Sequence, residues 1–330
     1  MARKADMMVF FDSQMKPVRG EEIEVDPRYN LDLACVTAAP PMGKWASSTY
    51  DVLLRVDRFG DNLVDQDVYI ANSREDLISV GRKAILCLQH TPQDISQDGV
   101  RKLFRVGVRM MTIAYNGETP FGGGFKVPNV PLTDAGKELI RWFGESGMIL
   151  DLSHAGHQTA RDALNFIEES DINIRVVASH GGVFEKYPNP RNLPMELLRR
   201  IVEMGGLVGV YALTFGLTGE DHLGGFSAFL DHLSYLFGEL RGFERSICIG
   251  TDAVYRERPI SEWKGEFDVM AGSIPQGESF PARFPDTSYE FNTPRLFDIV
   301  EHEVRDAFPN FSDGILGENM FRFFSEALPR

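Results

Sequence analysis

The chain has 330 residues, which is enough for one large α/β barrel or for two smaller domains. Its hydrophobic content of 43% and charged content of 25% are typical of a globular protein. The formal net charge of −14 argues against a nucleic-acid-binding protein and against binding to anionic membranes, because both need a basic surface.

The three cysteines and the N-terminus predict the cellular location of the protein. Cys35, Cys87 and Cys248 lack C-x-x-C spacing, which argues against a disulfide scaffold or a structural zinc site. The N-terminal apolar run at residues 7–11 is too short for a signal peptide, and nothing approaches the length of a transmembrane span. We therefore expect a reduced, cytoplasmic protein with no membrane partner.

The chain alternates short apolar runs with segments of helical periodicity. Residues 1–28 are polar and irregular, which predicts an N-terminal arm or short hairpin. Apolar runs then predict buried strands at residues 30–37, 84–88, 108–114, 148–152, 176–178, 206–211 and 246–250. Helical segments are predicted at residues 50–59, 74–81, 99–105, 132–144, 160–167, 193–204, 226–240, 293–307 and 314–327. This alternation indicates a parallel sheet covered by helices on both faces.

The total length favours a closed (β/α)8 TIM-type barrel at residues 29–330 as a single domain after the arm. Residues 256–292 are rich in proline, glycine and charged residues, and no eighth strand can be identified there. The prediction therefore includes a barrel that is distorted at its eighth strand. An open doubly wound sheet is the alternative. The absence of G-x-G-x-x-G after a first strand argues against dinucleotide binding.

Polar side chains follow the predicted strands. They are Gln89 and His90, Tyr115 and Asn116, His154, His180, and Asp252. His154 and His180 each end a Ser-His pair after consecutive strands, and the carboxyl ends of neighbouring parallel strands lie side by side. Imidazoles and a carboxylate at one rim are the ligands of a hydrolytic zinc site. A lone histidine after a strand is more often a buried polar residue of the core, but two Ser-His pairs at equivalent positions of consecutive units favour a functional role.

Three further residues have two interpretations each. Asp252 could transfer protons in catalysis, or it could cap the helix that follows its strand. Arg191 lies on a long loop after His180, where its planar guanidinium could bind a substrate carboxylate or could be a solvated charge. His157 could support His154 one turn into a helix, although we expect it to be exposed. The glycine- and proline-rich loop at residues 117–131 could cover the site.

Several separated motifs carry a family resemblance. LTDAGKELIRWFGESGMILDLSH, VVASHGG followed by PRNLP, ICIGTDA and ILGENMFRFF together resemble the membrane (renal) dipeptidase family of zinc metallopeptidases, in the amidohydrolase superfamily. The resemblance runs from about residue 85 to the C-terminus. It implies a dipeptidase-like hydrolase with a TIM-type barrel, acting in proteolysis on a small amide or dipeptide with a free carboxylate. It also allows a homodimer.

The resemblance implies residue roles. His154 and His180 correspond to zinc ligands, Asp252 to the general acid/base and Arg191 to the residue that binds the dipeptide's carboxylate. The substrate contacts are Tyr115 and the neighbouring Asn116.

Two departures from the family pattern bear on the metal. The family's first strand ends in H-x-D, which is missing from residues 31–36, and the bridging glutamate after the second strand is Gln89 here. Because an amide is neutral, Gln89 would be a weak ligand, with His90 and Asp252 as the other candidates for a third. We therefore predict at most one zinc ion per chain. The alternative function is a barrel that binds a small carboxylate ligand without catalysis, or that catalyses a different reaction, without a two-zinc centre.

Overall fold

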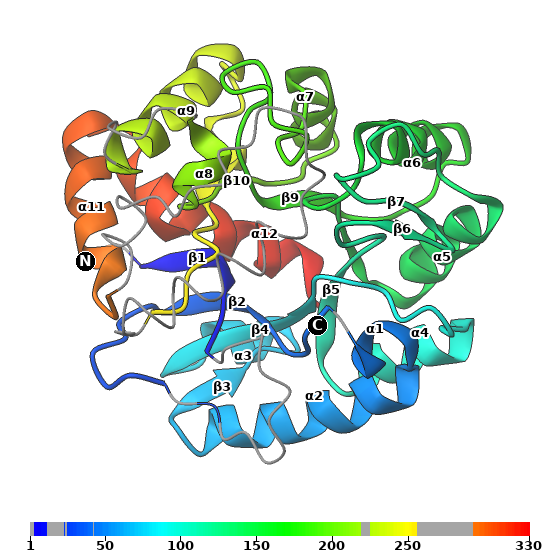
Figure 1. The fold of residues 1–330 in the computed structure, drawn as a ribbon. Helices are drawn as coiled ribbons and strands as arrows, with labels where there is room; N and C mark the ends of the chain where they lie inside the picture. The colour runs from blue at the N-terminus through cyan, green and yellow to red at the C-terminus, as the bar shows by residue number, and fades with distance from the viewer. Residues whose placement is uncertain (1–2, 12–22, 24, 42, 219–224, 256–292) are drawn as a thin grey trace.

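Eight parallel strands form a nearly closed barrel in the computed structural model, which describes residues 3–11, 23, 25–41, 43–218, 225–255 and 293–330 (Figure 1). In their order around the barrel, the strands are β1 (Ala5–Val9), β2 (Leu33–Thr37), β4 (Arg82–Leu88), β5 (Val108–Thr112), β8 (Ile149–Asp151), β9 (Val176–Gly181), β10 (Val208–Val210) and β11 (Ile247–Ile249). The short strand β3 (Val68–Ile70) pairs with the start of β4, and β6 (Glu118–Thr119) forms a separate hairpin with β7 (Gly122–Gly123). The predicted TIM-type barrel is confirmed.

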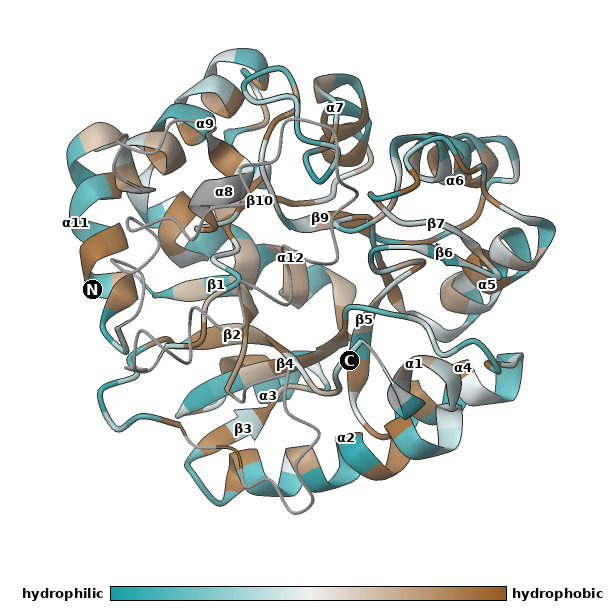
Figure 2. Cartoon of the chain, in the orientation of Figure 1, coloured by the Kyte–Doolittle hydropathy of each residue, from teal (hydrophilic) through white to brown (hydrophobic). Residues whose placement is uncertain are grey.

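Helices surround the barrel, with their apolar residues turned towards the strands (Figure 2). They are α1 (Lys44–Ser47), α2 (Thr49–Val64), α3 (Arg74–Ile78), α4 (Gln97–Arg105), α5 (Asp134–Ser146), α6 (His157–Glu169), α7 (Met195–Glu203), α8 (Thr214–Leu217), α9 (Gly225–Glu239), α11 (Leu296–Ala307) and α12 (Asn319–Ala327), with a 3-10 turn η1 (Glu244–Ser246) and a π turn η3 (Gly314–Glu318). Four helices begin where a hydroxyl accepts from a backbone N–H of the first turn, at Ser48, Ser73, Ser96 and Thr133.

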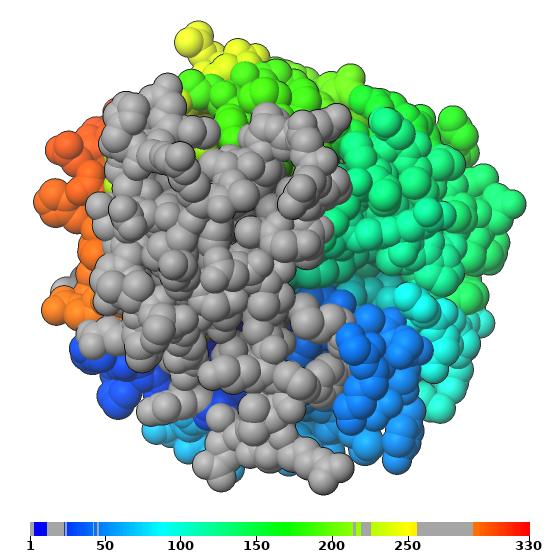
Figure 3. Space-filling view, viewed as in Figure 1, coloured from blue at the N-terminus to red at the C-terminus, as the bar shows by residue number. Residues whose placement is uncertain are grey.

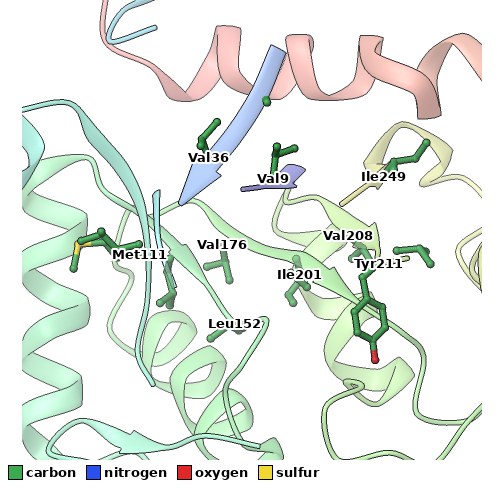
Figure 4. Packing of buried hydrophobic residues seen from close by; sticks show 14 of the residues in the cluster. Val9, Val36, Met111, Leu152, Val176, Ile201, Val208, Tyr211 and Ile249 are labelled. Carbon is green, nitrogen blue, oxygen red and sulfur yellow. The ribbon is translucent and has the colours of Figure 1, made fainter. Parts of the chain in front are cut away.

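Two apolar layers hold the barrel. The larger one lies between strands and helices, and Figure 4 shows part of it, with Val9 and Val36 on strands and Ile201 on α7. The smaller one fills the barrel interior and continues into α12, whose Met320, Phe321, Phe323 and Phe324 belong to the same cluster. In the space-filling view, segments that follow one another in sequence occupy neighbouring sectors of the surface (Figure 3). Such winding is typical of repeated βα units.

The N-terminal segment is different from the prediction. Residues Ala5–Val9 were expected to lie in an arm or short hairpin, but they form β1, a fully buried barrel strand parallel to β2. Consequently β2, which was expected to be the first strand, is the second one. Residues 12–22 and 24 of the expected arm lie outside the described residues, as do residues 256–292. The apolar run of β1 is short and contains Asp6, so its sequence resembles a polar arm.

A seam between β1 and β11 closes the barrel. Val9 forms an isolated parallel bridge with Ala253, and the backbone N–H of Asp252 donates to the Met8 carbonyl at 2.9 Å. The buried carboxylate of Asp6 also crosses the seam. It accepts hydrogen bonds from the Thr251 N–H (2.9 Å), the Thr251 hydroxyl (2.6 Å) and the Tyr255 hydroxyl (2.6 Å). Side chains therefore reinforce a closure that has few backbone hydrogen bonds among the described residues.

Candidate functional site

The structure brings the two predicted histidines together. His154 follows β8 and His180 lies in β9, and their Nε2 atoms are 3.0 Å apart. Both imidazoles are buried. Burial lowers the pKa of each imidazole well below its usual value, and the positive charge of Arg191 lowers it further. Both rings are therefore neutral near pH 7, the state in which an imidazole nitrogen can bind a metal.

Asp252 faces the same cluster from the end of β11. Its Oδ1 atom lies 3.9 Å from His180 Nε2 and accepts a hydrogen bond of 3.3 Å from the Gln89 side-chain amide. Burial raises the pKa of Asp252 to about 6, although the charge of Arg191 and the Gln89 hydrogen bond oppose this shift. The backbone of Asp252 has φ of 59°, a left-handed conformation that is unfavourable for a residue with a side chain. The fold thus holds this carboxylate in a strained conformation, with a pKa close to neutral.

Arg191 is a buried residue and not a solvated loop charge. Its side chain is 5% exposed, its Nη1 group donates to the Ser153 carbonyl, and its guanidinium carbon lies 5.5 Å from the centre of the Tyr211 ring. Its Nη2 atom is buried without a hydrogen-bond partner among the described residues. A buried N–H group of a charged side chain is costly when it is unpaired. Within the described part of the chain, Arg191 therefore has a donor that an anionic ligand could satisfy.

The loop that carries Arg191 is fastened by two residues. The buried Asn192 amide accepts from the Gly182 N–H (2.9 Å) and the Tyr211 hydroxyl (3.0 Å), and it donates to the Gly216 carbonyl (2.7 Å). His157, which was expected to be exposed, is half-buried because its Nε2 donates to the Asn192 carbonyl at 2.8 Å. The motif around Arg191 predicted a functional loop. The spacing of its residues did not show that Asn192 and His157 hold this loop in place.

Aromatic side chains line His154. Tyr115 stacks on its ring with centroids 4.2 Å apart, and Phe125 lies at 6.1 Å. Asn116 presents its side-chain oxygen to His154 Nδ1 at 3.1 Å. Phe125 comes from the glycine-rich loop, whose backbone joins the site because its N–H donates to the His154 carbonyl at 2.9 Å. The sequence analysis did not single out Phe125, but the glycine- and proline-rich composition of its loop indicated that the loop could cover the site.

The number of metal-ligating side chains near His154 and His180 determines which kind of metal site they can form. Two neutral imidazole nitrogens 3.0 Å apart can share one ion, since zinc–nitrogen distances are about 2.0–2.1 Å. Among the described residues, no three His, Cys, Asp or Glu side chains are grouped so that they could hold a metal ion. The described residues therefore supply two imidazole nitrogens that one ion could share, without a third His, Cys, Asp or Glu ligand grouped with them.

The structure places residues 31–36 at the second strand, and Asp32 among them away from the histidine pair. Residues 31–36, compared above with H-x-D, belong to the second strand, because β1 precedes them. The chain nevertheless has no histidine before His90, so H-x-D is missing in either alignment. Asp32 precedes β2 and accepts from the backbone N–H of Lys4 at 2.7 Å, at the end of the strand opposite the site. It therefore cannot supply negative charge to the histidines.

Comparisons with known proteins agree with the fold and the motifs. The model of the membrane dipeptidase family, peptidase family M19, matches residues 64–263, more than half of the chain. An uncharacterized dipeptidase of Schizosaccharomyces pombe is 26% identical over 191 residues, which cover 57% of this chain and 41% of that protein. The chain thus matches less than half the length of this curated relative.

Solved structures resemble the chain over almost its whole length. An amidohydrolase from Pseudomonas aeruginosa has a TM-score of 0.72 at 18% identity and covers 99% of this chain and 96% of its own. A metallopeptidase described as dipeptidase AC has a TM-score of 0.67 at 18% identity, covering 100% and 99%. A metallopeptidase from Rhodobacter sphaeroides, bound to a phosphinate mimic of L-Ala-D-Ala, has a TM-score of 0.65 at 17% identity, covering 98% of each. These similarities establish the barrel fold, and the match to the family model shows that the chain belongs to the membrane dipeptidase family.

Proposed function

We propose that this protein is a metal-dependent hydrolase that cleaves small amides or dipeptides with a free carboxylate. The observation that carries the proposal is the convergence of the two imidazoles with the Asp252 carboxylate and with the Arg191 Nη2 group, which has no hydrogen-bond partner among the described residues. Hydrolysis of a dipeptide needs a proton acceptor beside the scissile bond and a cationic group for the terminal carboxylate. The cluster contains both, and the relatives named above are called dipeptidases or metallopeptidases.

Each side chain has a role in this proposal. Asp252 takes the proton of the attacking water and returns it to the leaving amine, which suits a carboxylate with a pKa of about 6. Arg191 binds the substrate carboxylate, and Tyr115 contacts the substrate beside His154. Asn116 holds the His154 ring, and its contact with substrate stays a prediction. A zinc ion at His154 and His180 would supply polarisation of the scissile carbonyl and activation of water.

The experiment that tests the proposal is a hydrolysis screen of dipeptides with the zinc-supplemented protein. Hydrolysis of any dipeptide that is lost on treatment with a chelator supports the enzyme. Binding of a dipeptide without hydrolysis would support the second candidate, a non-catalytic carboxylate-binding barrel. The buried Arg191 Nη2 group, which has no partner within the described part of the chain, favours this second candidate as well, because a contact between Arg191 and a carboxylate needs no metal.

Arg191→Ala should remove the preference for a free carboxylate. A charge-assisted hydrogen bond contributes about 1.5–3 kcal/mol, so KM for a dipeptide should rise about tenfold or more. The same dipeptide with an amidated C-terminus serves as the matched substrate, since it cannot use this contact. In the variant, kcat/KM for the two substrates should become similar. If the wild-type preference for the free acid survives, Arg191 does not bind the carboxylate.

We propose at most one zinc ion per chain. Zinc analysis after gel filtration should give one equivalent or less, because a second cation needs anionic ligands and Gln89 is neutral. Gln89→Glu should raise zinc affinity, whereas Gln93→Glu, at an exposed position nearby in sequence, should leave it unchanged. Two equivalents that survive gel filtration would contradict the proposed stoichiometry.

We further propose a reducing, cytoplasmic setting, which is supported by three buried cysteines that are all unpaired. Among the described residues, no helix is both long and apolar enough to cross a membrane. The predicted homodimer and the absence of a nucleic-acid partner stay predictions.

A further inference from the structure

A buried carboxylate lies between the two Ser-His pairs. Asp151, the last residue of β8, accepts hydrogen bonds from the backbone N–H groups of Ser153 (3.0 Å) and Ser179 (3.1 Å). It also accepts from the hydroxyls of both serines, with 2.6 Å for Ser153. All three side chains are almost completely buried. Burying a carboxylate is costly, and four donors aimed at one side chain offset that cost.

The serine of the second pair continues the contacts to a histidine ring. Ser179 Oγ lies 2.6 Å from His180 Nδ1, while the Ser153 hydroxyl accepts from the His180 backbone N–H at 3.0 Å. A hydroxyl has one hydrogen, and an ionised carboxylate can only accept. The Ser179 hydrogen is therefore directed to Asp151, and Ser179 presents a lone pair to His180 Nδ1. That nitrogen must then carry the proton of the neutral ring.

The same reasoning holds for His154. Its Nδ1 faces the side-chain oxygen of Asn116, which can only accept, so this nitrogen also carries the ring proton. With both Nδ1 atoms protonated, both Nε2 atoms have lone pairs, and these atoms are 3.0 Å apart. Two facing lone pairs repel each other until a cation lies between them.

We propose that Asp151 and Ser179 are positioning residues that set the tautomer of His180 and so prepare the histidine pair for a cation. The inference rests on the proposed function in that the histidine pair is the metal site. Ser153 supports Asp151 but does not contact an imidazole nitrogen in this network. In metal sites, partners that orient a ligating imidazole commonly change metal affinity by 10–100-fold.

The test measures ring tautomers by 15N NMR of histidine side chains in the zinc-free protein at pH 8. In the wild type, His180 should carry its proton on Nδ1. Ser179→Ala removes the acceptor of that proton, so the Nε2–H form should appear, with His154 Nε2 as its new acceptor. Ser153→Ala is the matched control, because it also removes one hydroxyl from Asp151 and should leave the His180 tautomer unchanged.

Asp151→Asn tests the same hydrogen bonds from the other end, because it keeps Ser179 and replaces the acceptor of its hydrogen by a donor. It also serves as a second variant if Ser179→Ala does not fold. The amide oxygen can keep the two backbone N–H donors, while the NH2 group donates to Ser179 Oγ. The Ser179 hydrogen is then free to turn to His180 Nδ1, and His180 should change to the Nε2–H form. Zinc affinity, measured by competition with a chelator, should fall about 10–100-fold in Asp151→Asn and Ser179→Ala.

Three results would overturn the inference: an Nε2–H tautomer of His180 in the wild type, equal effects of Ser179→Ala and Ser153→Ala, or an unchanged tautomer in Asp151→Asn. The tautomers are measured without zinc or substrate. A protein that hydrolyses no dipeptide would therefore refute the proposed function but not this inference. Unexpected tautomers would refute this inference but not the proposed function.

Discussion

Replacing Asp252 with asparagine is expected to lower kcat for dipeptide hydrolysis by about 10²–10⁴-fold. Asparagine has nearly the same shape and can keep the contact with Gln89, but an amide cannot take a proton from water near neutral pH. The measurement is steady-state kinetics on the dipeptides that the wild type cleaves, together with thermal unfolding of the variant. Unfolding should change little, because the hydrogen bond and the shape of the side chain are kept.

The control for this variant is Asp57→Asn, the same chemical change at an exposed position of α2. It should leave kcat unchanged. If Asp252→Asn keeps the wild-type kcat, Asp252 is not the proton acceptor, and its strained backbone would need another explanation.

The second large effect is expected at the seam, where Asp6→Ala should lower the free energy of unfolding by about 3–5 kcal/mol. The variant leaves four donors without an acceptor: the N–H groups of Met8 and Thr251 and the hydroxyls of Thr251 and Tyr255. Thermal unfolding should show a decrease in Tm of roughly 5–10 °C. Asp57→Ala, at an exposed site, should change Tm little.

The pH dependence of stability gives a separate test of Asp6. Burial raises the pKa of Asp6 from 3.8 to about 6 in the folded protein. The folded state therefore binds the proton more tightly than the unfolded state. The stability that this group contributes is fully present below pH 3.8 and is lost as pH rises through about 6.

Asp6→Asn lacks this titration and can keep part of the network. The wild type should therefore lose stability relative to Asp6→Asn between about pH 4 and pH 6.5, by roughly 3 kcal/mol or less. Chemical denaturation of both proteins across this range measures the difference, and the titrations of other groups cancel in the comparison. A difference that stays constant with pH would show that the pKa of Asp6 is the same in both states.

The histidine pair could be predicted from sequence because the order of the strands determines where the two residues lie. His154 and His180 follow consecutive parallel strands, and such strands end on the same side of a barrel. The alternation of apolar runs and helical segments likewise predicted a parallel sheet covered by helices, and the length of the chain favoured the closed barrel over the open sheet. These features depend on local patterns that repeat along the chain.

Features that depend on distant partners were not visible in the sequence. β1 has no local pattern that distinguishes it from an arm, since its Asp6 is polar and is compatible with burial only because of Thr251 and Tyr255. The orientation of Asp151 and Ser179 towards a histidine ring depends on how β8 and β9 lie beside each other. Spacing within the motifs gives the residues but not the hydrogen bonds between them.

The seam also has a consequence for the order in which the protein can be made. Asp6 and Thr251 are 245 positions apart, and Arg3 and Glu318, which form an ion pair, are 315 positions apart. A ribosome that adds about 5–20 residues per second needs roughly 10–50 s to synthesise β11, on the other side of the seam, after β1. During that time the apolar strand is without the partner that closes the barrel. Long-range closure of this kind is slow, so molecular chaperones that protect the N-terminal segment should increase the yield of folded protein.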